Sequence, residues 1–295
     1  MPSVRESLLR TLNSIAYLPT MPRVLFELEE AMRDYNTAAD RLGRIIRRDP
    51  ALTASVLRVA NSAIYRGKLS KRISSVPLAI VRLGYTEVRR ICMSTAIIRA
   101  FDGYGSGINH PAFWRHCVTV ASVTRIFDKY TSKPGLLSSD ELEDAFVAGL
   151  LHDVGMLVME QFFPELFARS QAVAEEKLVP LARAELDALG IHHGEIGGAL
   201  LRNWSLAERV SGAVTWHHDP DQSDPGHRRV TQLVHLADFI CVNQSIGDTV
   251  EGLYDGFSVG AWYDLGLSVE QVPNMLEDLK TESDRSEIMG EAEAA

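Results

Sequence analysis

Apolar side chains recur at three- and four-residue intervals along almost all of this 295-residue chain. One such run begins just after residue 140, and its apolar face is formed by Leu142, Phe146, Leu150, Val154 and Val158. This spacing places side chains on one face of an α-helix, whereas a half-buried strand would alternate apolar and polar residues. Ser138 and Glu141 stand three residues apart at its start, as in a capping box. The sequence therefore predicts an all-α fold.

Glycines at positions 103, 105 and 107 interrupt the helical pattern and predict a domain boundary. We expect an N-terminal helical lobe over residues 1–105 and a helical core over residues 106–247. A C-terminal extension, residues 248–280, ends in an amphipathic helix from Ser268 to Lys280. The remaining residues, 281–295, are acidic and small, and they predict a disordered tail.

Composition narrows the class of protein. The chain is 46% hydrophobic and 23% charged, which is typical of soluble globular proteins. No apolar run approaches the roughly 20 residues needed to span a bilayer, and the N-terminus lacks the apolar core of a secretory signal. Its three cysteines, Cys92, Cys117 and Cys241, are widely spaced, which favours reduced thiols. We therefore expect a cytoplasmic protein without a membrane association.

Positive charge is concentrated in one segment. The whole chain carries a net charge of −9, yet residues 41–100 contain thirteen Lys or Arg against Asp49 and Glu87 alone. Solvated helix faces would explain this, and so would a surface for a nucleotide, a nucleic acid or an acidic protein. No nucleic-acid recognition motif is present, so the sequence does not favour that partner. Arg44, Arg47 and Arg48 mark the docking surface that we prefer.

Seven imidazoles and carboxylates are set in the apolar helical text of the predicted core: His116, His152, Asp153, His193, His217, His218 and Asp238. A polar group is costly to bury without a partner. The mixed nitrogen and oxygen set of His116, the His152-Asp153 pair and Asp238 suits Fe, Mn, Ni or Zn rather than Ca. The other three histidines could hold a second ion bridged by Asp153. Two such ions would form a site that activates water and clamps a phosphate.

Each of these residues also has a structural interpretation. A single buried histidine is often a hydrogen-bonded member of a core, and an adjacent His-Asp pair arises by chance. His217 and His218 could form a polar helix end, where a cationic side chain suits the helix dipole. His192 is an alternative to His193 as a ligand. The argument for metal therefore depends on the joint pattern.

Motifs of other catalytic classes are missing from the sequence. No GxSxG segment is present, so a serine nucleophile on a strained turn is not predicted. GxxxxGK[ST] and GxGxxG segments are also missing, which argues against P-loop and Rossmann nucleotide sites. Metal-assisted chemistry is the reaction class that the residues support.

The segments FVAGLLHDVGMLVME, HHGEIGGALLRNWSLAERVSGAVTWHHDP and LVHLADFI resemble the HD superfamily. The N-terminal segments LPTMPRVLFEL, IIRRDPALTASVLRVANSAIY and ISSVPLAIVRLGYTEVRRI are similar to HDOD domains, the HD-related output domains of bacterial signalling proteins. The resemblance covers residues 15–245. It implies an N-terminal helical lobe packed on an HD-like helical core, and a role in signal transduction. Most members of the family are regarded as non-catalytic output or scaffold domains.

The resemblance also implies roles for the seven residues. His116 matches the first ligand of the HD pattern, His152-Asp153 match the HD pair, and Asp238 matches the final aspartate. The three remaining histidines match additional ligands of the related HD-GYP phosphodiesterases, and they are His193, His217 and His218. The resemblance thus implies a site for one or two divalent ions.

Two departures from that pattern argue against catalysis. Active HD-GYP proteins carry HDxGK, and this chain has HDVGM, with Met156 in place of the lysine. A lysine would offer charge to a substrate phosphate or a proton to its leaving group, and Met offers neither. The GYP signature is replaced by DPDQSDPGHRR, in which His227, Arg228 and Arg229 could supply charge instead.

Two functions follow from these expectations. The first is a regulatory output module that binds metal and contacts a signalling protein in trans, with a nucleotide as a further candidate ligand. The alternative is a metal-dependent phosphohydrolase or cyclic-dinucleotide phosphodiesterase, in which Asp153 would be catalytic. The sequence favours the first because of Met156 and the missing GYP run.

Overall fold

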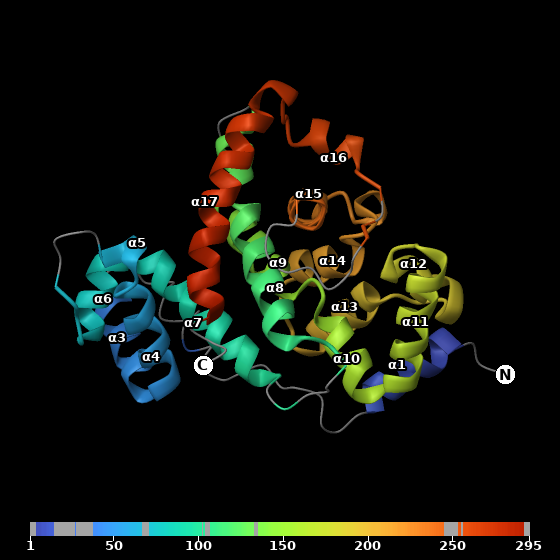
Figure 1. Ribbon diagram of the computed structural model, residues 1–295, viewed down its shortest axis with the longest axis horizontal. Coiled ribbons are helices and arrows are strands. Elements are labelled where there is room, and N and C mark those ends of the chain that lie inside the picture. Colours follow the sequence, from blue (N-terminus) through green and yellow to red (C-terminus); the bar gives the residue numbers. More distant parts are fainter. Residues whose placement is uncertain are drawn as a thin grey trace. The chain divides into compact units, whose positions relative to one another are not determined.

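The computed structural model describes residues 4–14, 27, 38–66, 71–101, 103, 107–132, 135–244, 253, 254 and 256–291 (Figure 1). Within these residues the regular secondary structure is entirely helical, which confirms the predicted all-α fold. The chain divides into two compact units, one formed by Met1–Leu18 with Tyr104–Ser286 and the other by Pro19–Gly103 with Glu287–Ala295. Each unit is described separately below.

The unit that begins at Pro19 contains five described helices: α3 (Ala38–Arg48), α4 (Pro50–Ala60), α5 (Ala63–Arg66), α6 (Val76–Leu83) and α7 (Tyr85–Ala100). Helices α3, α4 and α6 pack on one another, and α7 packs on α4 and α6. Asp49 starts α4, where its side chain accepts hydrogen bonds from the amides of Ala51 and Leu52. The Arg99 guanidinium of α7 also binds Asp49 and so ties the two helices together.

The other unit contains the helices α1 (Val4–Ser14), α8 (His110–Thr124), η1 (Ile126–Lys129), α9 (Ser139–Leu151), α10 (Val154–Phe162), α11 (Pro164–Lys177), α12 (Leu181–Leu189), α13 (His193–Asn203), α14 (Glu208–Trp216), η2 (Pro220–Gln222), α15 (Arg228–Asn243), α16 (Val259–Asp264), η3 (Val269–Gln271) and α17 (Val272–Glu291). Helices α8, α9 and α15 pack against one another, and α14 packs on α9 and α15. Helix α13 contacts both α14 and α10, and α11 pairs with α12 (Figure 1).

The helical run predicted after residue 138 is two helices. The capping box is present: the Ser138 hydroxyl accepts from the Glu141 amide, and the Glu141 carboxylate accepts from the Ser138 amide. Helix α9 then ends at Leu151 and α10 starts at Val154, so the His152-Asp153 pair occupies the junction. This junction places both polar side chains beside the helix ends rather than on the edge of one helix.

The chain termini differ from the expected domain limits. Helix α1 packs on α13, where Arg5 pairs with Glu195, although residues 1–105 are predicted as one lobe. The last helix continues to Glu291, beyond its predicted end at Lys280 and through most of the predicted disordered tail. Acidic composition indicates solvation, but Glu and Met are also good helix formers and allow an existing helix to continue. Residues 292–295 lie outside the described part of the chain.

Two properties bear on the protein's surroundings. None of the described helices combines the length and apolar character that a bilayer crossing requires. Cys92, Cys117 and Cys241 are buried free thiols.

Candidate metal centre

The structure brings all seven predicted residues together in the unit that contains α8–α15. His116 lies within α8, the His152-Asp153 pair follows α9, and His193 is the first residue of α13. His217 and His218 directly follow α14, and Asp238 lies within α15. Six of the seven side chains are almost completely buried, and His218 is partly exposed.

Glycines allow these helices to approach closely enough to assemble the cluster. A Cβ atom on Gly149 of α9 would lie 2.8 Å from the backbone of α8. On Gly155 of α10 it would lie 1.9 Å from the backbone oxygen of His193. On Gly198 of α13 it would lie 1.9 Å from Thr215 Oγ1 of α14. The pairs α8–α9, α10–α13 and α13–α14 therefore pack at distances that only glycine permits.

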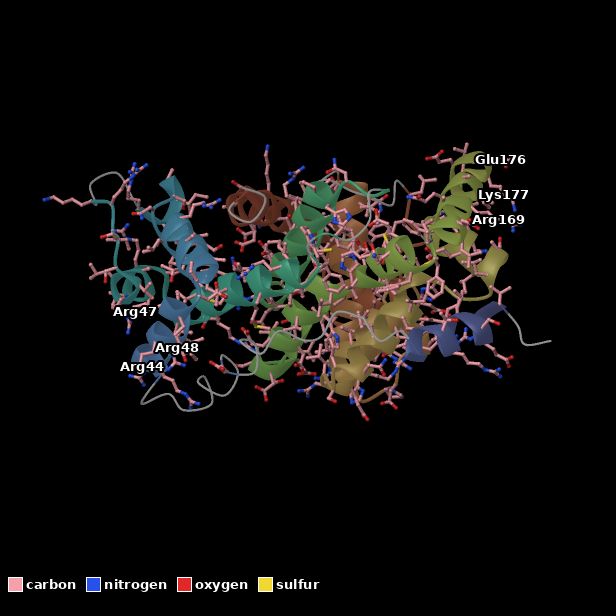
Figure 2. All side chains as sticks on the ribbon, turned by 90° about the horizontal axis from the view of Figure 1, so that it is seen from below. Arg44, Arg47, Arg48, Arg169, Glu176 and Lys177 are labelled. Carbon is pink, nitrogen blue, oxygen red and sulfur yellow. The ribbon has the colours of Figure 1, made fainter. Side chains whose placement is uncertain are left out.

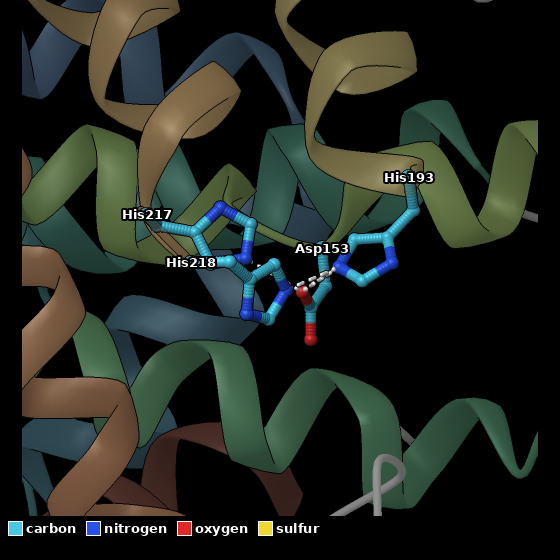
Figure 3. A group of neighbouring side chains, drawn as sticks. All are labelled: Asp153, His193, His217 and His218. Carbon is cyan, nitrogen blue, oxygen red and sulfur yellow. Dashed lines mark hydrogen bonds and ion pairs between the residues drawn. The ribbon is translucent and has the colours of Figure 1, made fainter. Parts of the chain in front are cut away.

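One half of the cluster, here called the His193 group, consists of Asp153, His193, His217 and His218. Figure 3 shows the carboxylate of Asp153 between the imidazole of His193 and those of the two histidines after α14. Asp153 Oδ1 lies 3.2 Å from His193 Nε2 and 3.6 Å from His217 Nε2. The Nε2 atoms of His193 and His218 are 2.9 Å apart.

The other half, here called the Asp238 group, consists of His116, His152, Asp153 and Asp238. His116 Nε2 lies 3.0 Å from Asp238 Oδ1 and 4.0 Å from Asp153 Oδ2. His152 Nε2 lies 3.1 Å from Asp153 Oδ2 and 3.6 Å from Asp238 Oδ1. Asp153 therefore turns one carboxylate oxygen toward each group.

Many of these buried atoms have no hydrogen-bond partner among the described residues: both ring nitrogens of His116, Nε2 of His152 and His217, and both carboxylate oxygens of Asp153 and Asp238. Each unsatisfied group costs about 1–3 kcal/mol. Some approach others within 3.0–3.6 Å, yet without hydrogen-bond geometry, so they converge on shared space. Atoms bound about 2.1 Å from one ion would show similar separations, so the residues fit a divalent metal.

Hydrogen bonds to the other ring nitrogens direct Nε2 into the cluster. His152 Nδ1 lies 2.7 Å from the Gly149 carbonyl oxygen, and His217 Nδ1 lies 2.8 Å from the Val214 carbonyl oxygen. A carbonyl oxygen can only accept, so both Nδ1 atoms donate and both Nε2 atoms keep a lone pair in the neutral ring. Partners of this kind orient histidine ligands in known metal sites.

The electrostatics of the cluster separate its histidines. Burial opposes charge on His152, but Asp153 and Asp238 outweigh it and raise the pKa of His152 to about 9. Burial alone would raise the pKa of Asp153, yet the charge on His152 holds it well below its usual value. Burial lowers the pKa of His217 and, aided by neighbouring histidines, holds that of His218 well below its ordinary value. In the absence of metal, a proton at neutral pH therefore resides on His152 rather than His218.

His192 has a structural place outside the two groups. It precedes α13 as its N-cap, and its Nδ1 accepts a hydrogen bond of 3.1 Å from the Gly194 amide. Burial lowers the pKa of His192 to about 2, so its ring is neutral. The geometry therefore brings His193 into the cluster and leaves His192 to cap the helix.

The residues near the missing motifs carry no obvious catalytic charge. Met156 is completely buried in α10. Arg228 donates to loop carbonyl oxygens around η2, and Arg229 pairs with Glu141 of α9. His227 precedes α15 as its N-cap. None of these described contacts involves the seven-residue cluster.

Two buried glutamates were not foreseen from the sequence. Glu185 of α12 binds His193, and Glu160 of α10 accepts hydrogen bonds from the amides of Gly107 and Ile108. Glutamate is usually a solvated residue in amphipathic helices, and both stand in ordinary helical text. Only their full burial distinguishes them, and that depends on the tertiary structure.

Comparison with known proteins gives consistent family and fold matches. The family model described as HDOD domain matches residues 18–220. A crystal structure of an HDOD domain protein of unknown function from Geobacter sulfurreducens is 26% identical, with a TM-score of 0.78, and the match covers 96% of this chain and 98% of that one.

Two further solved structures share the fold. One, from Shewanella amazonensis SB2B and named "Putative phosphohydrolase", is 22% identical with a TM-score of 0.73, covering 97% of this chain and 98% of that one. Another, from Marinobacter aquaeolei VT8 and named "Putative signal transduction protein", is 23% identical with a TM-score of 0.75, covering 100% and 62%. An "Uncharacterized protein" of Treponema pallidum (strain Nichols) is 23% identical over 220 residues, or 75% of this chain. The match spans 41% of that curated relative, less than half its length.

Proposed function

The chain belongs to the HDOD domain family, and from that membership we propose that it is a regulatory module of bacterial signal transduction that binds divalent metal. One observation carries the metal proposal: buried nitrogen and oxygen atoms of the cluster converge without hydrogen-bond partners among the described residues. An empty cluster would leave these polar atoms unsatisfied in an apolar core, and a bound cation would satisfy them.

The two groups define the proposed ligands. One ion would be held by the Asp238 group and the second by the His193 group, with Asp153 shared between them. A bound divalent ion supplies positive charge and Lewis acidity. The protein contributes fixed ring orientations at His152 and His217, through the carbonyl oxygens that bind their Nδ1 atoms.

The surroundings favour regulation over catalysis. Met156 has neither charge nor a transferable proton, so it cannot stabilise a leaving group. Arg228 and Arg229 are engaged in loop and helix contacts rather than directed at the cluster. A site of this kind can hold an ion and thereby set the packing of the helices that carry the ligands.

A phosphohydrolase is the second candidate, and a specific observation supports it. Asp153 presents one oxygen to each group, which is the arrangement of a carboxylate that bridges two ions in metallohydrolases. His218 is the partly exposed member of the cluster, so it marks a side from which a substrate could approach. In this function Asp153 would be the catalytic residue whose loss abolishes turnover.

Metal content and turnover distinguish the two candidates. Protein expressed anaerobically with added iron should contain metal by elemental analysis, and Asp153→Ala should lose it. Asp140→Ala, an exposed carboxylate on α9, is the matched control. Regulation predicts no hydrolysis of cyclic dinucleotides or generic phosphate esters above the Asp153→Ala background. Turnover that requires Asp153 would instead establish the phosphohydrolase, and metal-free protein would refute both proposals.

The proposed partner is an acidic signalling protein that docks on α3. Arg44, Arg47 and Arg48 are exposed on this helix, and they make no hydrogen bond or ion pair with the described residues (Figure 2). An unpaired positive surface attracts an anionic partner and accelerates encounter. Reversing these charges to Glu should abolish partner binding. Reversing Arg169 and Lys177 of α11, also exposed, should not. Intact binding after the first reversal would refute this docking surface, and loss of a nucleotide alone would replace the protein with that ligand.

A further inference from the structure

Glu185 is a completely buried carboxylate that binds a single residue twice. Its Oε2 atom lies 2.8 Å from the backbone nitrogen of His193 and 2.8 Å from His193 Nδ1. A buried carboxylate is expensive unless donors surround it, so its position requires a compensating contact. Both donors come from the residue that opens α13. Glu185 therefore fixes the backbone and the ring of His193 at the same time.

The ring of His193 is thereby held in one tautomer. A carboxylate accepts hydrogen bonds, so the Nδ1 atom donates to it and Nε2 is left facing the cluster. Nε2 lies 3.2 Å from Asp153 Oδ1 and 2.9 Å from His218 Nε2. The atom available to a metal ion is thus the one that Glu185 does not contact.

This support differs from that of the other oriented histidines. His152 and His217 donate Nδ1 to backbone carbonyl oxygens, which are neutral. A carboxylate also adds negative charge to the imidazole and strengthens its remaining nitrogen as a donor. The difference singles out the His193 group, because Glu185 contacts no described member of the Asp238 group.

We propose that Glu185 is a positioning residue for metal, which sets the tautomer and donor strength of His193 and so raises the affinity of the His193 group for its ion. This inference rests on the proposed metal function. It extends the functional set from the seven predicted residues to α12, a helix that carries none of them. Partners in this position typically change metal affinity 10–100-fold when removed.

Glu185→Gln tests the charge while preserving volume and an acceptor oxygen. Equilibrium binding of Mn²⁺ should show one ion bound at least about tenfold more weakly than in the wild type. The ion of the Asp238 group should be nearly unaffected, and His116→Ala, which removes a ligand from that group, identifies it. Glu176→Gln, an exposed glutamate on α11, should match the wild type (Figure 2).

The outcomes separate this inference from the proposed function. A wild type that binds no Mn²⁺ overturns the metal function. A wild type that binds while Glu185→Gln binds equally well overturns the inference alone, as does equal weakening of both ions. Should the variant not fold, Zn²⁺-loaded wild type still decides by ¹⁵N NMR, with the His193 signals assigned through His193→Gln. A proton on Nδ1 supports the proposal, and a proton on Nε2 refutes it.

Discussion

Replacing Gly155 with alanine should separate the helices that build the cluster. The added Cβ atom would lie 1.9 Å from the His193 backbone oxygen, 2.7 Å from the His193 carbonyl carbon and 2.8 Å from the Gly197 nitrogen. All three are backbone atoms, so α10 and α13 must move apart, because no side chain can rotate away. Overpacking of this kind costs about 1–3 kcal/mol. In a protein of this size each kcal/mol lowers Tm by about 2–4 °C.

The same movement should weaken metal binding, because Asp153 and His193 lie on the two separating helices. Thermal unfolding followed by circular dichroism, together with Mn²⁺ titration, measures both effects. Gly212→Ala in α14 is the control, since its Cβ would meet nothing within 4 Å. That variant should be neutral or stabilised by about 0.5–1 kcal/mol, because alanine is the better helix former. A Gly155→Ala protein with unchanged Tm and unchanged Mn²⁺ affinity would contradict the reasoning.

Three further changes have defined outcomes. Mn²⁺ affinity should rise about tenfold per pH unit from pH 6 to 8 in calorimetric titrations, since His152, with a pKa of about 9, must lose its proton before it binds an ion; a flat profile would contradict this. Glu160→Gln should lower stability by about 1–3 kcal/mol in urea unfolding, because it weakens charge-assisted bonds to two amides and to His110; an unchanged midpoint would refute that role. Asp49→Ala should cost about 0.5–2 kcal/mol by the same measurement through loss of the α4 cap, whereas Asp140→Ala should cost little.

Local sequence signals predicted much of the helical architecture. Ser138 with Glu141, and Asp49 before Pro50, mark helix starts that the structure contains. These signals succeed because capping depends on neighbours within three residues. The seven cluster residues were also recognisable, because imidazoles and carboxylates are rare in apolar helical text. The structure brings them together, and their role as ligands remains the proposal tested above.

Features that depend on tertiary packing could not be predicted. The break at His152 and Asp153 is hidden because apolar residues continue at helical spacing into α10, whose own face is buried. Glu185 resembles any solvated glutamate until α12 is packed beside the start of α13. The extent of α17 was underestimated because acidic text suits both a disordered tail and an exposed helix.

Helix α10 has a polar anchor at each end, and together they make it a lever. Asp153 precedes its first turn within 4.0 Å of His116, and Glu160 in its last turn lies 2.9 Å from His110, so both anchors reach α8. Seven residues of helix separate them by about 10 Å. Glu160 also holds the amide of Gly107, close to where the chain passes between the two compact units. A force applied to that connection is therefore felt at Asp153, and linkage requires that any ion altering α10 change the tension on the connection in return.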